Sequence, residues 1–160
     1  MPEKKKLFFE NIKEDQLELI ISRLKTFIES KNVRFFYFSG VIGVGKTSFI
    51  RMMLRTLGVT ETIKSPSFSM VETYEVDDKS FVHIDLFRMQ DPNSWKTDEI
   101  SAAFDDSTDY VFIEWPEKGN DLPTPDIKIN IRHNKNAHDT NVRDIAIEIN
   151  TISTLRNKIK

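Results

Sequence analysis

The feature that most constrains the fold of this chain is a short glycine-rich segment, Gly40–Thr47, with the sequence GVIGVGKT. It matches the pattern G-x-x-x-x-G-K-[ST], in which glycines let backbone N–H groups approach phosphates and the next helix directs its positive end at them. The chain has only five glycines, and three of them lie at positions 40, 43 and 45. The sequence therefore predicts a phosphate-binding loop between a buried strand and a helix.

Two residues of this loop contribute side chains as well as backbone groups to phosphate and metal binding. Lys46 carries a positive charge within reach of the outer phosphates, and the Thr47 hydroxyl is suited to ligate the Mg²⁺ that accompanies a nucleotide. Segment 134–137 partly matches the guanine-reading pattern Asn-Lys-x-Asp, but Ala137 replaces its carboxylate, so we predict ATP and not GTP. The residues predicted to bind the nucleotide are Gly40, Gly43, Val44, Gly45, Lys46, Thr47 and Ser48.

A phosphate loop also requires an acid that holds or orients the metal, usually at the end of a neighbouring strand. Asp85 follows the apolar run 81–84, and Glu114 follows the apolar run 110–113. Either carboxylate suits that role, and Glu114 could also polarise an attacking water, so the direct metal ligand stays open between them. The predicted catalytic residues are Lys46, Asp85 and Glu114, and the predicted metal site is formed by Thr47, Glu114 and Asp85.

Length and composition favour one domain over residues 1–160, with a flexible segment at 1–10 and a tail or short helix at 151–160. A net charge of -2 argues against a broad nucleic-acid-binding surface, and the absence of cysteine excludes disulfides and thiolate chemistry. The sequence has neither a signal-peptide pattern nor an apolar run near the roughly 18 residues of a membrane span. We therefore expect a cytoplasmic protein without membrane association.

Hydrophobic periodicity predicts the remaining elements. Helical spacing occurs at about 14–28, 47–57 and 93–104, and extended runs occur at 33–39, 71–76, 81–86 and 110–113. Alternating isoleucines at 127–131 and 145–149 predict a C-terminal antiparallel β-hairpin. Together these segments indicate an α/β fold.

Other residues with functional chemistry have two interpretations each. Trp115 could stack on a nucleotide or partner, or pack beside the proline turn that follows it. Arg88 could compensate charge in a complex or cap a strand end. His83, His133 and His138 lack the spacing of metal ligands, so we predict structural roles for them.

Four motifs, in this order, resemble the TsaE family, the bacterial ATPases of tRNA threonylcarbamoyladenosine synthesis. They are GVIGVGKT at Gly40–Thr47, KSPSF at Lys64–Phe68, IDLFR at Ile84–Arg88 and IEWPE at Ile113–Glu117. The resemblance implies a small P-loop NTPase-like domain whose mixed parallel and antiparallel sheet is flanked by helices, with ATP and Mg²⁺ as cofactors. It also implies that TsaD and TsaB are partners and that tRNA is met only through them. In that family, Mg²⁺-dependent ATP hydrolysis, weak in isolation and stimulated by partners, resets the TsaB–TsaD complex.

By the same resemblance, Lys46 contacts phosphates, Thr47 and Glu114 serve the magnesium site, and Asp85 is an essential polar member of that site. The spacing of Ser65, Pro66, Ser67 and Phe68 alone favours a simple turn, whereas the resemblance implies a mobile switch loop that senses the γ-phosphate. Two alternative functions stay open: a small-molecule P-loop kinase, and an ATP-dependent scaffold without catalysis.

Overall fold

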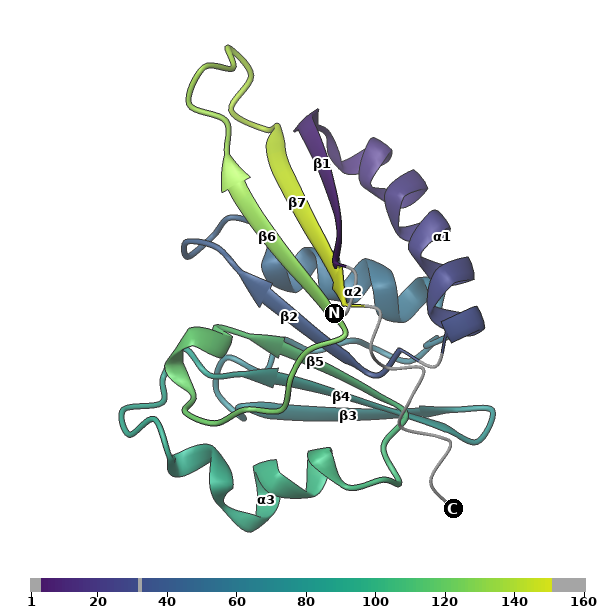
Figure 1. Cartoon of the computed structure of the whole chain (residues 1–160), viewed down its shortest axis with the longest axis vertical. Coiled ribbons are helices and arrows are strands. Elements are labelled where there is room, and N and C mark those ends of the chain that lie inside the picture. Colours follow the sequence, from purple (N-terminus) through teal and green to yellow (C-terminus); the bar gives the residue numbers. More distant parts are fainter. Residues whose placement is uncertain (1–3, 32, 151–160) are drawn as a thin grey trace.

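The computed structural model describes residues 4–31 and 33–150, which form one seven-stranded sheet with helices on both faces (Figure 1). The strands are β1 (Lys4–Ile12), β2 (Phe35–Ser39), β3 (Val71–Val76), β4 (Lys79–Asp85), β5 (Tyr110–Glu114), β6 (Ile127–His133) and β7 (Arg143–Asn150). The α-helices are α1 (Glu14–Lys31), α2 (Lys46–Thr56) and α3 (Asp98–Ser101). Short 3-10 helices are η1 (Ser94–Lys96), η2 (Ala102–Phe104) and η3 (Pro116–Lys118).

The sheet is mixed, with the strand order β1-β7-β6-β2-β5-β4-β3. Its centre is parallel, since β2 pairs with β5 and β6 in parallel and β4 pairs with β5 in parallel. Its outer pairs β3–β4, β6–β7 and β1–β7 are antiparallel. The predicted α/β fold and the C-terminal β-hairpin are therefore confirmed.

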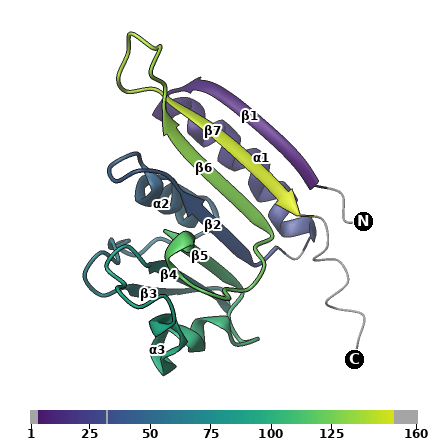
Figure 2. The ribbon, with the colours of Figure 1, turned by 60° about the vertical axis from the view of Figure 1, so that its left-hand side comes forward.

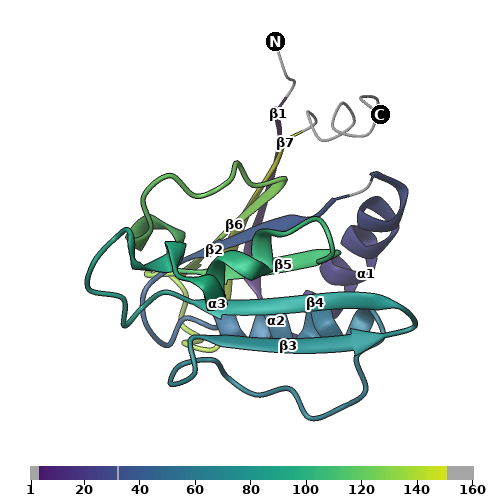
Figure 3. The same cartoon turned by 90° about the horizontal axis from the view of Figure 1, so that it is seen from below.

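Both faces of the central strands are buried, which explains why β2 has an unbroken apolar and aromatic sequence. Phe36 and Phe38 point to the face that α1 and α2 cover, whereas Phe35 and Tyr37 point to the face that α3 covers. Figure 3 shows α2 and α3 on opposite sides of β4 and β5, and Figure 2 shows α1 and α2 behind the sheet. The sheet thus separates two apolar layers, and α2 belongs to the larger one.

The expectation of a flexible segment at 1–10 is wrong for residues 4–10, because they belong to β1. Alternate residues of this strand, including Leu7 and Phe9, pack against the core, and the strand covers the edge of β7. Lys4 and Lys6 lie near Glu148 of β7, with Nζ–O distances of 3.3 and 3.9 Å. Lysines on an edge strand discourage further strand pairing, so the charged sequence suits an edge as well as it suits a tail.

The helix predicted at about 93–104 is divided into the three short helices η1, α3 and η2. Thr97 is extended, with ψ 156°, and interrupts the helical pattern. The Trp95 indole anchors this segment by donating to the carbonyl of Asn120 at 2.7 Å. The predicted tail at 151–160 lies outside the described residues, and none of the described helices is long and apolar enough to cross a membrane.

The orientation of α1 can be tested with two neighbouring residues. Ile21 is 1% exposed and packs in the core, whereas Leu19 is 68% exposed on the opposite face. We expect Ile21→Ala to lower the free energy of unfolding by about 2–5 kcal/mol, because it leaves a cavity. Leu19→Ala should change it by no more than about 0.5 kcal/mol. Urea denaturation measures both values, and equal losses would contradict this packing.

Candidate functional site

The predicted phosphate loop, residues 40–47, connects the end of β2 to the start of α2. Its first glycine lets the loop backbone approach β6 closely, since a Cβ on Gly40 would lie only 2.5 Å from the carbonyl oxygen of Ile131 in β6. Gly45, directly before α2, has φ +114°, which residues with side chains rarely adopt. Through these two positions the loop turns tightly, and the unpaired N–H groups of the first turn of α2 point toward it.

Lys46 is the first residue of α2, and its side chain folds back over the loop. Nζ donates hydrogen bonds to the carbonyl oxygens of Gly40 at 2.6 Å and Val41 at 3.0 Å. Burial lowers the pKa of the Lys46 ammonium, while neighbouring carboxylates oppose that change. A buried cation is thereby held against the loop that is predicted to bind anions.

Asp85 and Glu114 end the adjacent parallel strands β4 and β5, and their Cα atoms are partners in the register. Both side chains are buried. Burial raises the pKa of Asp85 and Glu114 adds to the rise, whereas the N–H of Phe87, which donates to Oδ1 at 2.9 Å, opposes it. The register therefore brings the two candidate acids side by side at one edge of the sheet.

A hydrogen bond joins the first turn of α2 to the end of β5. The Thr47 hydroxyl donates to Glu114 Oε1 at 2.7 Å. Within residues 4–31 and 33–150, no three His, Asp or Glu side chains are close enough to hold a metal ion by themselves. Mg²⁺ usually takes only one or two carboxylates and completes its shell with phosphate oxygens and water. The hydroxyl of Thr47 and the carboxylates of Glu114 and Asp85 therefore fit a Mg²⁺ that arrives with a nucleotide.

These groups meet in a cleft of about 290 Å³. The lining residues come from the loop, the start of α2, the segment 65–68, and the ends of β4 and β5 with the residues that follow them: Ile42, Gly43, Gly45, Lys46, Thr47, Ser48, Ser67, Asp85, Phe87, Glu114 and Trp115. Gly40 and Val44, which are also predicted to bind the nucleotide, are not among them. Gly40 instead packs against β6, and Val44 lines a second cleft described below.

The segment Ser65–Phe68 borders this cleft through one residue, Ser67. The hydroxyl oxygens of Ser65 and Ser67 are 2.8 Å apart, so the two side chains are hydrogen-bonded to each other. Phe68 is 85% exposed, and the Arg88 guanidinium stacks 4.4 Å from its ring centre. Arg88 thus contacts the predicted switch loop and does not line the cleft.

Trp115 covers the ammonium of Lys46. It follows β5 directly and has φ +58°, a left-handed conformation that is strained for a residue with a side chain. Its ring centre is 4.1 Å from Lys46 Nζ and 5.0 Å from the ring centre of Phe87. The indole therefore packs at the cleft and also forms a cation–π contact there.

His83 also contacts the site, although it is not among the site residues predicted from the sequence. It lies in β4, two residues before Asp85, and its Nε2 is 2.8 Å from Glu114 Oε1. The sequence did contain a signal for this contact, because residues two apart on a strand point to the same face and His83 therefore shares the face of Asp85. The structure therefore gives His83 a contact with a candidate catalytic group.

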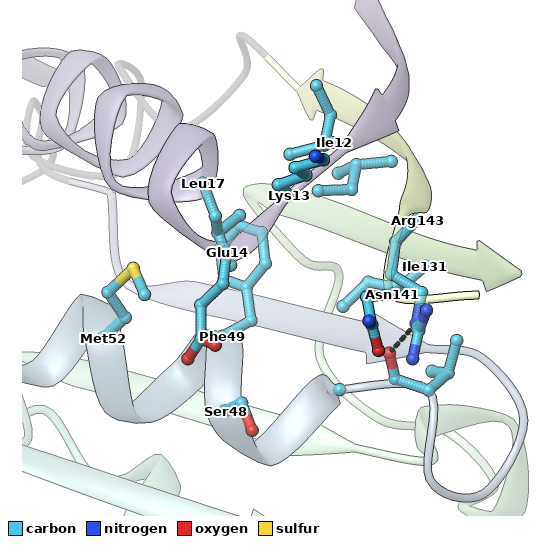
Figure 4. Close-up of a pocket in the computed structure, with 13 residues that line it drawn as sticks. Ile12, Lys13, Glu14, Leu17, Ser48, Phe49, Met52, Ile131, Asn141 and Arg143 are labelled. Carbon is cyan, nitrogen blue, oxygen red and sulfur yellow. Dashed lines mark hydrogen bonds between the residues drawn. The ribbon is translucent and has the colours of Figure 1, made fainter. Parts of the chain in front are cut away.

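A second cleft, of about 160 Å³, opens on the other side of the α2 N-terminus (Figure 4). It shares Gly45 and Ser48 with the first cleft, so the two meet at the start of α2. Its walls are formed by Ile12, Lys13, Glu14, Leu17, Val44, Gly45, Ser48, Phe49, Met52, Ile131, Asn141, Arg143 and Ile145. The mixture of apolar walls and a few polar groups is typical of small-molecule sites.

Arg143 connects this second cleft to the phosphate loop, and it too is absent from the predicted site residues. Its Nε donates to the carbonyl oxygen of Val44 at 3.0 Å (Figure 4). Its Nη1 donates to the carbonyl oxygens of Thr140 at 2.6 Å and Val142 at 2.8 Å. One guanidinium therefore fixes the loop between β6 and β7 against the phosphate loop.

Comparison with protein families gives one matching description. Residues 12–144 match the family "Threonylcarbamoyl adenosine biosynthesis protein TsaE". The crystal structure of Bacillus subtilis YdiB has a similar fold, with a TM-score of 0.62 and 22% identity over 93% of this chain and 87% of that one. The fold similarity agrees with the P-loop NTPase-like fold expected from the sequence.

Curated relatives bear the name "tRNA threonylcarbamoyladenosine biosynthesis protein TsaE". The Haemophilus influenzae protein is 40% identical over 97 residues, which are 59% of this chain and 60% of that protein. The Rickettsia conorii protein is 32% identical over 113 residues, which are 70% of this chain and 62% of that protein. The matched segments thus span less than two-thirds of the length of either relative.

The buried carboxyl of Asp85 has a consequence for stability. Because its pKa is raised above the ordinary value of 3.8, the folded protein holds this proton to a higher pH than the unfolded chain does. The stability linked to this group is complete below the unfolded pKa and declines as the pH rises through the folded pKa. At neutral pH the ionised group is therefore destabilising.

We expect Asp85→Asn to be more stable than the wild type at about pH 7.5, since it removes the buried charge and retains an acceptor for the Phe87 N–H. The difference should shrink as the pH falls toward about 4. Urea denaturation in EDTA without nucleotide measures this. A variant that is less stable at neutral pH, or a difference that does not vary with pH, would contradict it.

Proposed function

Because this chain belongs to the TsaE family, we propose that it is a Mg²⁺-dependent ATPase that acts in tRNA threonylcarbamoyladenosine biosynthesis. The observation that carries this proposal is the hydrogen bond between Thr47 and Glu114 at the phosphate loop. It joins a hydroxyl and a carboxylate, the two protein groups that P-loop ATPases use most often at magnesium. Burying a hydroxyl, a carboxylate and a lysine together is unfavourable, and a glycine-rich turn without a ligand does not require it.

In this proposal the loop N–H groups and Lys46 bind the phosphates and neutralise their charge, which requires Lys46 to exchange its contacts with the loop carbonyls for phosphate oxygens. Thr47 and Glu114, with Asp85 beside them, would hold Mg²⁺, which would supply further charge neutralisation. Water attacks the γ-phosphorus, the bond from that phosphorus to the ADP oxygen breaks, and a carboxylate orients the water and accepts the proton that it loses.

The segment Ser65–Phe68 is the proposed switch. Ser67 lines the cleft, so its hydroxyl can exchange its partner Ser65 for a γ-phosphate oxygen. Such an exchange would move Phe68, whose exposed ring stacks against the guanidinium of Arg88. The presence of ATP would then be communicated to the surface, where a partner could detect it.

The partners we propose are TsaB and TsaD, with tRNA met only through them. A formal net charge of -2 supports an indirect contact with tRNA, because direct binding usually requires a basic surface. We further propose that hydrolysis is weak in isolation, is stimulated by these partners and resets their complex between rounds. A protein in this role would act in the cytoplasm.

We expect Lys46→Ala and Glu114→Ala to lower ATP turnover by about a hundredfold or more, because the first removes a positive charge that stabilises the transition state and the second removes a proposed Mg²⁺ ligand. Both variants should also abolish repeated rounds of tRNA modification with TsaB and TsaD. ATP labelled at the γ-phosphate measures turnover and shows where the phosphoryl group goes. Exposed residues provide matched controls, Lys128→Ala and Glu75→Ala, which should behave as the wild type does.

The same measurements, with a Glu114→Gln variant added, distinguish the other two functions. Transfer of the label to a metabolite in preference to water would indicate a small-molecule kinase. Repeated modification by a Glu114→Gln variant that binds ATP without hydrolysing it would indicate a scaffold. Unchanged modification by both Lys46→Ala and Glu114→Ala would reject a role for this site in the pathway.

We assign the nucleoside of ATP to the second cleft. Ser48 and Gly45 border both clefts, so a ligand with its phosphates at the loop can continue into the second one. Phe49 and Met52 supply apolar surface, and Asn141 supplies polar atoms that could meet a base or a ribose. This assignment would explain why the β6–β7 hairpin is fixed to the loop.

We expect Met52→Trp to weaken ATP binding by about tenfold or more, since the indole would fill the cleft, and to leave inorganic triphosphate binding unchanged. Leu19→Trp, on the exposed face of α1, is the control for added bulk. Isothermal titration calorimetry with both ligands measures the difference. Equal weakening of both ligands, or of neither, would reject the assignment.

A further inference from the structure

His83 is fully buried, at 0% exposure, in the middle of the sheet. Side chains alternate between the two faces of a strand, so residues 81, 83 and 85 of β4 all point to the face that α2 covers. On this face Phe81 packs against Tyr110, with ring centres 5.0 Å apart. A phenylalanine or leucine would fill the next position on this face without burying polar atoms. The presence of an imidazole therefore requires an explanation beyond packing.

Among the described residues the imidazole has one hydrogen-bond partner, and that partner is a candidate catalytic group. Its Nε2 lies 2.8 Å from Glu114 Oε1, the same oxygen that accepts the hydrogen bond from Thr47 at 2.7 Å. A carboxylate can only accept, so Nε2 carries the hydrogen. The other ring nitrogen, Nδ1, is buried and has no hydrogen-bond partner among the described residues. A buried polar atom without a partner lowers the stability of the folded protein, and the hydrogen bond to Glu114 offsets part of that loss.

The two hydrogen bonds fix the position of Glu114 from two sides. One donor comes from β4 and the other from α2, and both reach the same carboxylate oxygen. With Oε1 held in this way, rotation about the last side-chain bond of Glu114 would break both bonds. If Thr47 were to bind a metal ion instead, the bond from His83 would still orient the carboxylate.

We propose that His83 is a positioning residue that holds the Glu114 carboxylate in its working orientation. His83 does not line the cleft, so it acts through Glu114 and not on the nucleotide itself. The proposal rests on the proposed function of Glu114 at a magnesium–nucleotide site. Hydrogen bonds of this kind to a metal-binding carboxylate are typically worth 10–100-fold in metal affinity or activity.

Two substitutions separate the hydrogen bond from the volume of the ring. His83→Leu fills the space and removes the donor, whereas His83→Gln can place an amide N–H near the position of Nε2. Phe81→Leu is the control for packing, because Phe81 is buried on the same face of the same strand and its side chain cannot hydrogen-bond to Glu114. Thermal unfolding of all three variants measures the loss of stability separately.

With TsaB and TsaD present, we expect His83→Leu to lower kcat for ATP at least tenfold and to raise the Mg²⁺ concentration needed for half-maximal rate. The KM for ATP should change less than about twofold, since the phosphate contacts are intact. His83→Gln should recover most of the rate, and Phe81→Leu should retain it despite lower stability. A wild-type rate for His83→Leu, or a His83→Gln variant that is no better than His83→Leu, would overturn the proposal.

A second measurement does not depend on activity. The chain has three histidines, so nitrogen NMR of the imidazoles can identify His83 by its disappearance in His83→Gln. We expect a hydrogen on Nε2 that is protected from exchange and whose resonance shifts in Glu114→Ala. Rapid exchange, or a resonance indifferent to Glu114→Ala, would overturn the positioning role even if the wild type hydrolysed no ATP. Absent hydrolysis with a protected Nε2 hydrogen would instead reject the proposed ATPase function and leave the contact established.

Discussion

The hydrogen bond from Thr47 to Glu114 is the interaction on which the candidate site depends, because it connects residues 67 positions apart in the chain. It can form only if two conditions hold together. The strands β2 and β5 must pair in parallel, so that the end of β5 lies beside the loop that follows β2. That loop must also turn tightly enough to begin α2 directly over the strand ends, as the conformations of Gly40 and Gly45 allow.

The same parallel pairing has an energetic cost at this edge of the sheet. Lys46, Asp85 and Glu114 are charged side chains that are largely removed from water, and isolated charges in such a place would be strongly destabilising. Their proximity lowers that cost, because one cation faces two carboxylates and each is hydrogen-bonded. The raised pKa of Asp85 and the lowered pKa of Lys46 show that the compensation is incomplete. A site that retains such unfavourable electrostatics gains stability when ligands of suitable charge bind to it.

Local patterns in the sequence predicted much of this arrangement. The phosphate loop, the apolar strands that end at Asp85 and Glu114, and the C-terminal hairpin each occupy a continuous stretch, so periodicity and turn residues were sufficient to identify them. The contact of His83 with Glu114 spans 31 positions, and that of Arg143 with Val44 spans 99. Such contacts depend on strand order and register, which periodicity does not specify. The strand β1 was missed for a related reason, since its lysines look like a solvated tail until β7 provides a partner.

The contacts at long sequence separation also give the outer part of the sheet a role beyond support. β6 approaches the loop at Gly40, and β7 contributes Arg143, which binds the carbonyl of Val44. Each contact involves the loop backbone, whose N–H groups are the proposed phosphate ligands. A shift of the β6–β7 hairpin would therefore change the loop directly, without passing through Lys46 or the two acids. Conversely, ATP with its nucleoside in the second cleft would contact the hairpin while its phosphates bound the loop. The C-terminal hairpin thus contacts the candidate site at Gly40 and Val44, and those contacts constrain its sequence as well as the core does.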